Sequence, residues 1–351
     1  MGYGDYPHLT GVKKILVIKL RQLGDVLLTG PVFSALQKKL PDAEIDAYVY
    51  SESIPLLKGH PAIHRCIGYD RAWKTLSWWQ RLALEWALLR QIRKNRYDLV
   101  INLTEGDRGA IAAKISQAPI RVGIAPKGRL QKKLYTHVVK NCPTLRHTVE
   151  RNLDALRRIG IFPAWEDREL YFPPPPPIAL PKNPYFLIHP TSRWRFKCLP
   201  IPKMRALAEA LIARGKSLVF TSGPDPEERA MVQQICQGLP VLDLSGKTSL
   251  QELGAWILHS ELLLSVDSLP LHIASALKKP VIALFGPTSD ATWGPWRNPH
   301  AKIIAQPFSC RPCYQDGCGG SKVSDCLATL PIETILKTVR ENDIPIPQTI
   351  C

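Results

Sequence analysis

The chain has 351 residues, 45% of them hydrophobic, and this length exceeds one ordinary domain. We therefore expect two domains, each able to bury its own core. The nine cysteines are an odd number, and the first residues, MGYGDYPHLTGVKK, contain no apolar stretch of the secretory kind. This argues against a secreted, disulfide-framed protein, and we expect a cytoplasmic location. The 46 Lys and Arg against 30 Asp and Glu give a formal charge of +16, which indicates an anionic partner.

The first half of the chain alternates apolar, strand-like runs with segments long enough to be crossover helices. The runs cover residues 14–20, 44–50, 63–69, 97–103 and 120–125. Neighbouring parallel strands need such crossovers, so the pattern predicts a parallel sheet covered by helices.

A proline-rich segment separates the two halves. Seven prolines lie among the fourteen residues YFPPPPPIALPKNP, positions 171–184. Proline has a fixed φ and no backbone N–H, so this segment predicts a stiff, extended connector. The expected organisation is an N-terminal domain of residues 1–172, a linker of 173–184, a C-terminal domain of 185–330, and a helix with a tail in 331–351.

The second half repeats the alternation and predicts another doubly wound α/β domain. Its apolar runs cover residues 185–189, 217–223, 241–245, 261–266 and 281–285. Open parallel sheets bind ligands beyond the carboxyl ends of their strands, so two tandem domains are expected to share a cleft. Asp267 and the Gly286-Pro287-Thr288 segment each follow a strand, and we expect them side by side on the rim of that cleft.

Residues 73–94 predict an amphipathic helix with Trp79, Leu82, Trp86 and Leu89 on one face. Basic residues Arg90, Arg93 and Lys94 stand near its end. Such a stripe usually packs against a core. The alternative is a surface helix at an anionic bilayer. No run approaches the roughly 18 apolar residues of a spanning helix, so any membrane contact is expected at the surface.

A second basic feature is the stretch 108–149, which contains no acidic residue. Its cations are Arg108, Lys114, Arg121, Lys127, Arg129, Lys132, Lys133, Lys140 and Arg146. This stretch is either a docking surface for phosphates of lipid, sugar or nucleic acid, or a solvated basic face without a ligand.

Polar residues that follow predicted strands are candidates for the site. Gly24 permits a tight turn after the first strand and places Asp25 at a helix start, as a cap or as a cleft-facing carboxylate. The loop HPTSRWRFK could bind a diphosphate through Thr191, Ser192 and Lys197, with Arg193 and Arg195. The alternative is an ordinary polar loop. The Glu227 carboxylate could accept hydrogen bonds from ribose hydroxyls, or it could only complement a helix dipole.

Four cysteines near the C-terminus, Cys310, Cys313, Cys318 and Cys326, lie within seventeen residues. They could close a zinc site, but the spacing is unusual for one, and reduced thiols in a long loop are the favoured interpretation. The Walker A spacing is absent around SGKTS, residues 245–249, and no G-x-G-x-x-G follows a strand.

The segments KLRQLGDVLLTGPVFSAL, HPTSRWRFK and VDSLPLHIASALKKPVIALFGPT, in this order, carry a resemblance that spans nearly the whole chain. The chain resembles glycosyltransferase family 9, the ADP-heptose heptosyltransferases of the lipopolysaccharide inner core. Within that family the resemblance favours members that add a branching heptose to the second heptose of the core.

The resemblance implies a GT-B fold, two Rossmann-like doubly wound parallel-sheet domains facing across a cleft. It implies inverting transfer, with Asp25 as the base and Lys197 at the leaving diphosphate. Implied donor-binding residues are Thr191, Ser192, Lys197, Glu227, Thr248, Asp267, His272, Gly286, Pro287 and Thr288. Lys19 matches a family lysine and is grouped with Arg121, Lys127 and Arg129 as acceptor-binding. Leu269 departs from a common family glycine.

The implied partners are ADP-heptose as co-substrate, a phosphorylated inner-core acceptor and an anionic membrane surface at the cytoplasmic face of the inner membrane. No cofactor and no metal are expected. The alternatives are another nucleotide sugar or core heptose acceptor and, more remotely, a basic nucleic-acid-binding protein. No RNP, KH or helix-turn-helix pattern accompanies the charge, so we do not expect a nucleic-acid partner.

Overall fold

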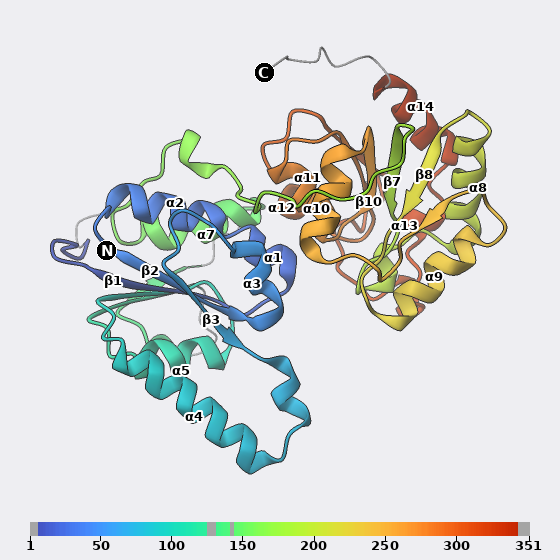
Figure 1. The fold of residues 1–351 in the computed structure, drawn as a ribbon. Coiled ribbons are helices and arrows are strands. Elements are labelled where there is room, and N and C mark those ends of the chain that lie inside the picture. The colour runs from blue at the N-terminus through green and yellow to red at the C-terminus, as the bar shows by residue number, and fades with distance from the viewer. Residues whose placement is uncertain (1–5, 125–130, 141–143, 343–351) are drawn as a thin grey trace. The chain divides into compact units, whose positions relative to one another are not determined.

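A computed structural model describes residues 6–124, 131–140 and 144–342. The chain divides into two compact units, Met1–Pro173 and Pro174–Cys351, and the division falls within the proline-rich segment. Each unit is built around one parallel sheet (Figure 1). No helix in the described part of the chain is long and apolar enough to cross a membrane.

The sheet of unit 1 has six parallel strands in the order β3-β2-β1-β4-β5-β6. The strands are β1 (Lys14–Lys19), β2 (Glu44–Tyr50), β3 (Arg65–Tyr69), β4 (Leu99–Asn102), β5 (Ile120–Ile124) and β6 (His137–Val139). The chain reverses its direction of winding between β1 and β4, which is the switch point where doubly wound sheets bind ligands. Sequence reasoning did not predict β6, a three-residue edge strand.

Helices cover both faces of this sheet. They are α1 (Leu23–Leu27), α2 (Gly30–Lys39), α3 (Ile54–Leu57), α4 (Trp78–Lys94), α5 (Asp107–Ile115) and α7 (Thr148–Arg157). In Figure 1, α2 and α7 lie on one face, and α4 and α5 lie together on the other. Ile15 to Ile18 of β1 are fully buried between these layers, as expected for a central parallel strand.

The orientation of α4 differs from the favoured prediction. Its core-facing residues are Leu88 and Ile92, whereas Trp79, Leu82 and Trp86 are exposed. The interpretation of these three side chains as core packing is therefore wrong, whereas Leu89, the fourth residue of the predicted stripe, is partly buried and packs against the core. The helix has two apolar stripes, and the buried one contains Leu88 and Ile92 near the C-terminal end.

Unit 2 repeats the topology of unit 1. Its sheet has the order β12-β11-β10-β7-β8-β9, so its first and fourth strands, β7 and β10, are again neighbours. The strands are β7 (Tyr185–His189), β8 (Ser217–Phe220), β9 (Leu242–Asp243), β10 (Leu262–Val266), β11 (Val281–Phe285) and β12 (Ala301–Ala305). The prediction of two Rossmann-like parallel sheets is confirmed. Edge strand β12 was not predicted.

The helices of unit 2 complete its two outer layers. They are α8 (Ile201–Ile212), α9 (Pro226–Cys236), α10 (Leu250–His259), α11 (Leu269–Ala276), α12 (Asp290–Trp293), α13 (Asp325–Ala328) and α14 (Ile332–Asn342). The last of these packs against α8 and contributes Ile335, Leu336 and Val339 to the buried cluster. The C-terminal helix is therefore part of the core of unit 2.

Candidate active site

The switch point of unit 1 is organised around the buried ammonium of Lys19, the last residue of β1. Its Nζ donates to the carbonyl of Leu103, 3.1 Å away, and to Oδ1 of Asn152 on α7, 3.2 Å away. The Asn152 amide in turn donates to the carbonyl of Leu28 at 3.1 Å. Burial lowers the pKa of Lys19, and the nearby Asp25 carboxylate opposes that shift. Lys19 thus ties β1, α7 and the segment after α1 together.

Asp25 lies 3.9 Å from the Lys19 ammonium, and its side chain is 19% exposed. It is the third residue of α1, and the residue at the helix cap is Gln22, which makes no side-chain cap hydrogen bond. Among the described residues, nothing donates a hydrogen bond to the Asp25 carboxylate. The structure therefore gives Asp25 an ion-pair neighbour and a partly exposed position, and it does not make Asp25 the capping residue.

The switch point of unit 2 carries a second lysine and aspartate. Lys197 ends the short 3₁₀ turn η4 (Arg195–Lys197), which follows β7, and Asp267 directly follows β10. The Lys197 ammonium lies 2.7 Å from the Asp267 carboxylate, and both side chains are largely buried. The pair joins the loops after the two strands that flank the switch point, where a ligand of a doubly wound sheet is expected.

Thr191 is held by a residue that sequence reasoning did not identify. Its hydroxyl donates to the carboxylate of Glu228 at 2.8 Å, and the backbone N–H of Gly223 donates to the same oxygen at 3.2 Å. The neighbouring Glu227 is exposed and has its backbone N–H capped by Asp225. Only the register of α9 decides which of the two glutamates turns inward, and the sequence contains no signal for that choice.

The other predicted donor-side residues lie in loops and helices that follow strands of this sheet. Ser192 is partly buried, and its hydroxyl accepts from the backbone N–H of Trp194 at 3.4 Å. Thr248 is also partly buried and precedes Ser249, the cap of α10. His272 is buried within α11, the helix that Leu269 begins. Leu269 thus occupies the first turn of the helix that begins shortly after Asp267.

The Gly286-Pro287-Thr288 segment follows β11, next to β10 in the sheet. A Cβ at Gly286 would lie 2.5 Å from Cδ1 of Leu327 on α13, so glycine is required there by close packing. The Thr288 hydroxyl is buried and has no hydrogen-bond partner among the described residues. A buried, unsatisfied hydroxyl is costly, and it is a group that a bound ligand can satisfy.

Arg311 fixes this segment and was also missed by sequence reasoning. Its guanidinium donates to the carbonyls of Gly286, Gln306 and Thr288 and pairs with Asp290 at 3.4 Å. Arg311 lies inside the cysteine-rich segment, where sequence analysis considered only the thiols. A guanidinium has five donors in a fixed plane, and this suits it to bind several carbonyls of one turn.

The cysteine cluster shows no metal-binding arrangement in the part of the chain that the structure describes. Cys310 and Cys318 are exposed, Cys313 is partly buried and Cys326 is buried, and all four are free thiols. Burial, reinforced by the neighbouring thiols, raises the pKa of Cys326 to about 11. Cys326 also lies beside the Gly286 position, so the cluster packs against the turn that Arg311 holds.

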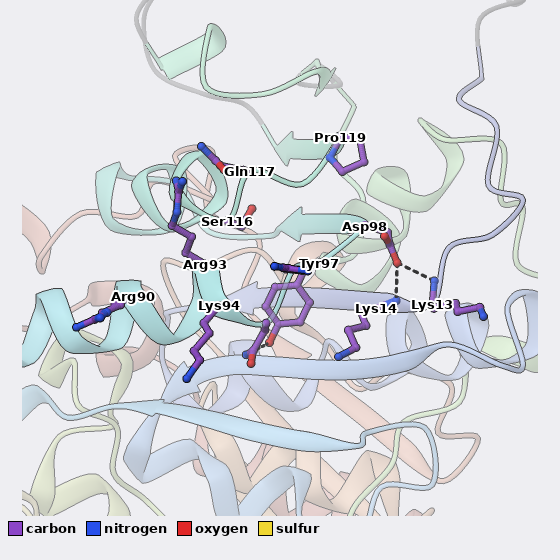
Figure 2. A pocket seen from close by; sticks show the side chains of 12 residues that line it. Lys13, Lys14, Arg90, Arg93, Lys94, Tyr97, Asp98, Ser116, Gln117 and Pro119 are labelled. Carbon is purple, nitrogen blue, oxygen red and sulfur yellow. Dashed lines mark hydrogen bonds between the residues drawn. The ribbon is translucent and has the colours of Figure 1, made fainter.

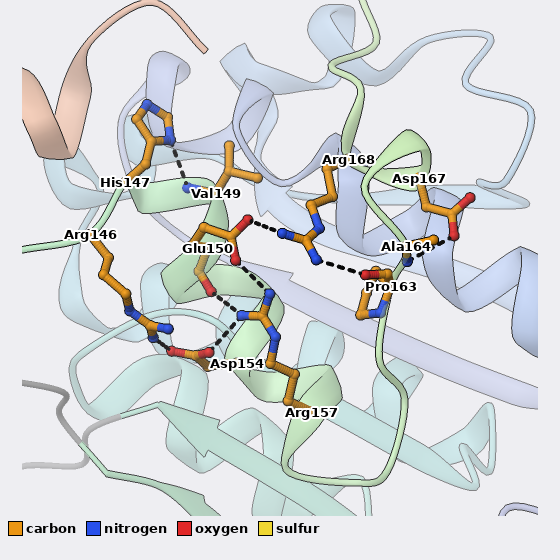
Figure 3. A network of polar contacts seen from close by, with 10 residues as sticks. All are labelled: Arg146, His147, Val149, Glu150, Asp154, Arg157, Pro163, Ala164, Asp167 and Arg168. Carbon is orange, nitrogen blue, oxygen red and sulfur yellow. Dashed lines mark hydrogen bonds and ion pairs between the residues drawn. The ribbon is translucent and has the colours of Figure 1, made fainter. Parts of the chain in front are cut away.

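Several arginines of the basic stretch 108–149 bind acids or carbonyls of unit 1. The Arg121 guanidinium donates to the carbonyls of Leu134 at 2.9 Å and Ala118, so it stabilises unit 1. Arg146 pairs with Asp154 on α7 within a network of arginines and acids (Figure 3). Arg108 pairs with Glu85 at 3.3 Å. Lys127 and Arg129 lie outside the described residues.

Comparison with known proteins identifies relatives of this chain. The family model described as glycosyltransferase family 9 (heptosyltransferase) matches residues 85–323. Lipopolysaccharide heptosyltransferase 3 of Escherichia coli is 36% identical over 293 residues, which is 80% of this chain and 85% of that protein. Lipopolysaccharide heptosyltransferase 1 of Pseudomonas aeruginosa is 25% identical over 320 residues, 87% of each chain.

Solved structures share the fold. A family 9 glycosyl transferase from Veillonella parvula superimposes with a TM-score of 0.76 at 22% identity, covering 94% of this chain and 97% of that one. The E. coli ADP-heptose lipopolysaccharide heptosyltransferase II gives a TM-score of 0.75 at 21% identity, covering 94% and 98%. Because the family model matches more than half of the chain and lipopolysaccharide heptosyltransferase 3 is 36% identical over most of both chains, the chain belongs to glycosyltransferase family 9, the heptosyltransferases.

Proposed function

We propose that this glycosyltransferase moves L-glycero-D-manno-heptose from ADP-heptose to a heptose of the lipopolysaccharide inner core, with inversion at the anomeric carbon. The extensive similarity to lipopolysaccharide heptosyltransferase 3 supports the branch heptose on the second core heptose as the product. The observation that carries the proposal is the Asp25 carboxylate, which is partly exposed at a switch point and receives no hydrogen bond from the described residues.

In this mechanism Asp25 acts as the general base. Its carboxylate takes the proton of the acceptor hydroxyl while that oxygen attacks the anomeric carbon of the donor. The bond from that carbon to the diphosphate oxygen breaks, and ADP leaves with the electron pair. The Lys19 ammonium is held by Leu103 and Asn152 and lies 3.9 Å from the carboxylate, so it helps to keep that carboxylate in place.

The donor occupies the switch point of unit 2. Lys197 faces the departing diphosphate, and Thr191, Ser192 and backbone N–H groups of the loop after β7 add donors. The orphan hydroxyl of Thr288 gains a partner when the donor binds. Glu227 accepts from the ribose hydroxyls. The remaining donor contacts in this proposal are Thr248, Asp267, His272, Gly286 and Pro287.

Because cationic side chains neutralise the leaving diphosphate, the reaction needs no metal or other cofactor. The acceptor side uses Lys19 together with Arg121, Lys127 and Arg129. The acceptor carries lipid acyl chains, so the enzyme works at the cytoplasmic face of the inner membrane as a peripheral protein.

The test compares Asp25→Ala with the wild-type enzyme on ADP-heptose and truncated core acceptors, with the product linkage mapped. We expect the rate to fall by roughly 10²- to 10⁴-fold, the usual contribution of a general base. ADP affinity, measured by calorimetry, should stay nearly unchanged. Asp42→Ala, at an exposed carboxylate of the same unit, is the matched control and should transfer normally. Near-normal heptose transfer by Asp25→Ala would exclude this role.

A further inference from the structure

Helix α4 presents an apolar face to solvent. Trp79, Leu82 and Trp86 are spaced three and four residues apart and therefore lie on one side of the helix. Their exposed fractions are 65%, 54% and 65%. Each Trp also has an indole N–H, which combines a large apolar surface with one polar edge. A soluble surface rarely gathers two Trp and a Leu in this way unless the patch binds something.

The direction of this face is fixed by the rest of unit 1. Leu88 and Ile92 are buried on the opposite side of the helix. Glu85, also inward, accepts from the Tyr69 hydroxyl at 2.7 Å and pairs with Arg108 at 3.3 Å. The helix begins with a capping box formed by Ser77 and Gln80. A helix anchored at its start and along its inner face cannot roll to bury the tryptophans.

The same exposed side becomes cationic toward the end of α4. Arg90 and Arg93 are exposed and continue the line of Trp79, Leu82 and Trp86 at helical spacing. Together with Lys94, they make no ion pair with any acidic side chain of the described residues. Three unpaired cations therefore adjoin the apolar face.

These cations line a cavity of about 1240 Å³ beside the end of α4 (Figure 2). Its cationic residues are Lys13, Lys14, Arg90, Arg93, Lys94 and Arg96, and Asp98 is its one acidic residue. Asp98 accepts from the backbone N–H groups of Lys13 and Lys14, both at 2.9 Å. Its carboxylate is therefore engaged by the backbone and leaves the charge of the cations uncompensated. A hollow with such an excess of positive charge attracts phosphate groups.

The cavity lies at the end of the sheet opposite the reaction site. Lys14 begins β1 and Lys19 ends it, and a strand of this length spans roughly 16 Å at about 3.3 Å per residue. Phosphates bound in the cavity would therefore leave the Lys19–Asp25 region open. This separation distinguishes a docking surface from a substrate subsite.

We propose that the outer face of α4 and the adjoining cationic cavity, here the α4 surface, dock the enzyme on a bilayer that contains anionic phospholipids. Trp79, Leu82 and Trp86 enter the headgroup region, where Trp is favoured, and the cations bind lipid phosphates. A second copy of the chain is a poor occupant, because it would bring two uncompensated cationic surfaces together. The inference extends the proposed function, whose acceptor is anchored in a membrane.

Vesicle co-sedimentation tests the α4 surface directly. The wild-type protein should bind vesicles of phosphatidylglycerol and phosphatidylethanolamine, and bind phosphatidylcholine vesicles far more weakly. Arg90→Gln with Arg93→Gln should lower the partition coefficient roughly thirtyfold, since each cation near the surface contributes about 1 kcal/mol. Trp79→Ser with Trp86→Ser should lose at least roughly tenfold, because both indoles leave the interface.

The matched control is Trp165→Ala, which removes another exposed indole of unit 1, 57% exposed and next to the turn that packs on α2. That face of the sheet is opposite α4, so binding should be unchanged. Equal vesicle binding by the double variants and the wild type, or equal binding to neutral vesicles, would overturn the docking surface. Transfer to an acceptor without acyl chains reports separately on the proposed function, and both double variants should retain it.

Discussion

At the residue scale, two buried histidines couple stability to pH. His189 ends β7 with its Nδ1 3.0 Å from the Thr221 hydroxyl, and burial lowers its pKa to about 3. His60 packs between Phe33 and Tyr171, and burial lowers its pKa to about 4. Both imidazoles are therefore neutral in the folded protein at every pH above about 5.

The sign of the pH effect follows from these lowered values. Between the unfolded pKa of about 6.5 and the folded pKa, the unfolded chain binds a proton that the folded chain does not. The free energy of unfolding should therefore fall as pH drops below about 6.5, by about 2 kcal/mol per histidine between roughly pH 7 and pH 5. Urea unfolding at the two pH values measures this loss, and His189→Gln should reduce it by about the contribution of one histidine. A variant with the wild-type pH dependence would contradict the assignment.

Single residues also mark where prediction from sequence ends. Asp25, Lys197 and Asp267 could be identified because each follows a strand or opens a helix, and that placement is set by local pattern. Glu228 and Arg311 could not, because they act through contacts with segments 37 and 25 residues away in the chain. Such contacts depend on helix register and loop path, which periodicity does not determine.

At the element scale, α13 and the turn after β11 are packed as one unit. Leu327 is fully buried and fills the space that a side chain at Gly286 would need. Arg311 also holds this turn, through the backbone carbonyls of Gly286 and Thr288. The position of the Thr288 hydroxyl therefore depends on a short helix much further along the chain.

This packing predicts a non-additive pair of substitutions. Gly286→Ala should destabilise unit 2 by about 1–3 kcal/mol, because the new methyl overpacks the site. Leu327→Ala should cost about 2–5 kcal/mol on its own through the cavity it leaves. In the double variant the methyl introduced at position 286 occupies part of that cavity, so the combined loss measured by urea unfolding should be smaller than the sum. Additive losses would show that the two positions do not share space.

The helix α4 shows the limit of prediction for an element. Its existence and the apolar stripe of Trp79, Leu82, Trp86 and Leu89 can be predicted from spacing alone. Which stripe is buried is decided by partners on β3 and α5, namely Tyr69 and Arg108, which hold Glu85 inward. Because those contacts are tertiary, the more aromatic stripe was assigned to the core, and the structure reverses that assignment for Trp79, Leu82 and Trp86.

At the scale of the whole molecule, the positive charge of the acid-free stretch has few internal partners. Lys114, Lys132 and Lys133 are exposed, and no ion pair joins them to acidic side chains in the described part of unit 1. Arg108, Arg121 and Arg146 are instead engaged by acids or carbonyls. The lysines, together with Arg121, whose partners are uncharged carbonyls, are therefore the described members of this stretch whose charge remains available to a polyanionic acceptor.

We accordingly expect the KM for a phosphorylated core acceptor to rise severalfold with ionic strength. Raising salt from about 0.01 M to about 0.15 M shortens the Debye length from roughly 30 Å to roughly 8 Å and screens exposed lysines. The same acceptor without its phosphates is the control and should show little change. Steady-state kinetics at the two salt concentrations measure this change in KM. A KM independent of salt would rule out this electrostatic contribution.

The two-unit plan itself could be predicted from the alternation of strands and helices, because parallel strands impose long crossovers. Edge strands β6 and β12 could not, because short and partly exposed strands lack a continuous apolar run. The order of strands was also beyond the sequence, since it depends on which crossover turns to which face of the sheet.

The repeated strand order has a consequence for how such a protein can diversify. In each sheet the outermost strands, β3 and β6 or β12 and β9, lie farthest from the central pair that carries the charged residues. Loops at those margins can lengthen, shorten or change in composition while the central geometry stays intact. New acceptor preferences can therefore arise by remodelling the periphery, and the chemistry at the middle can be inherited unchanged.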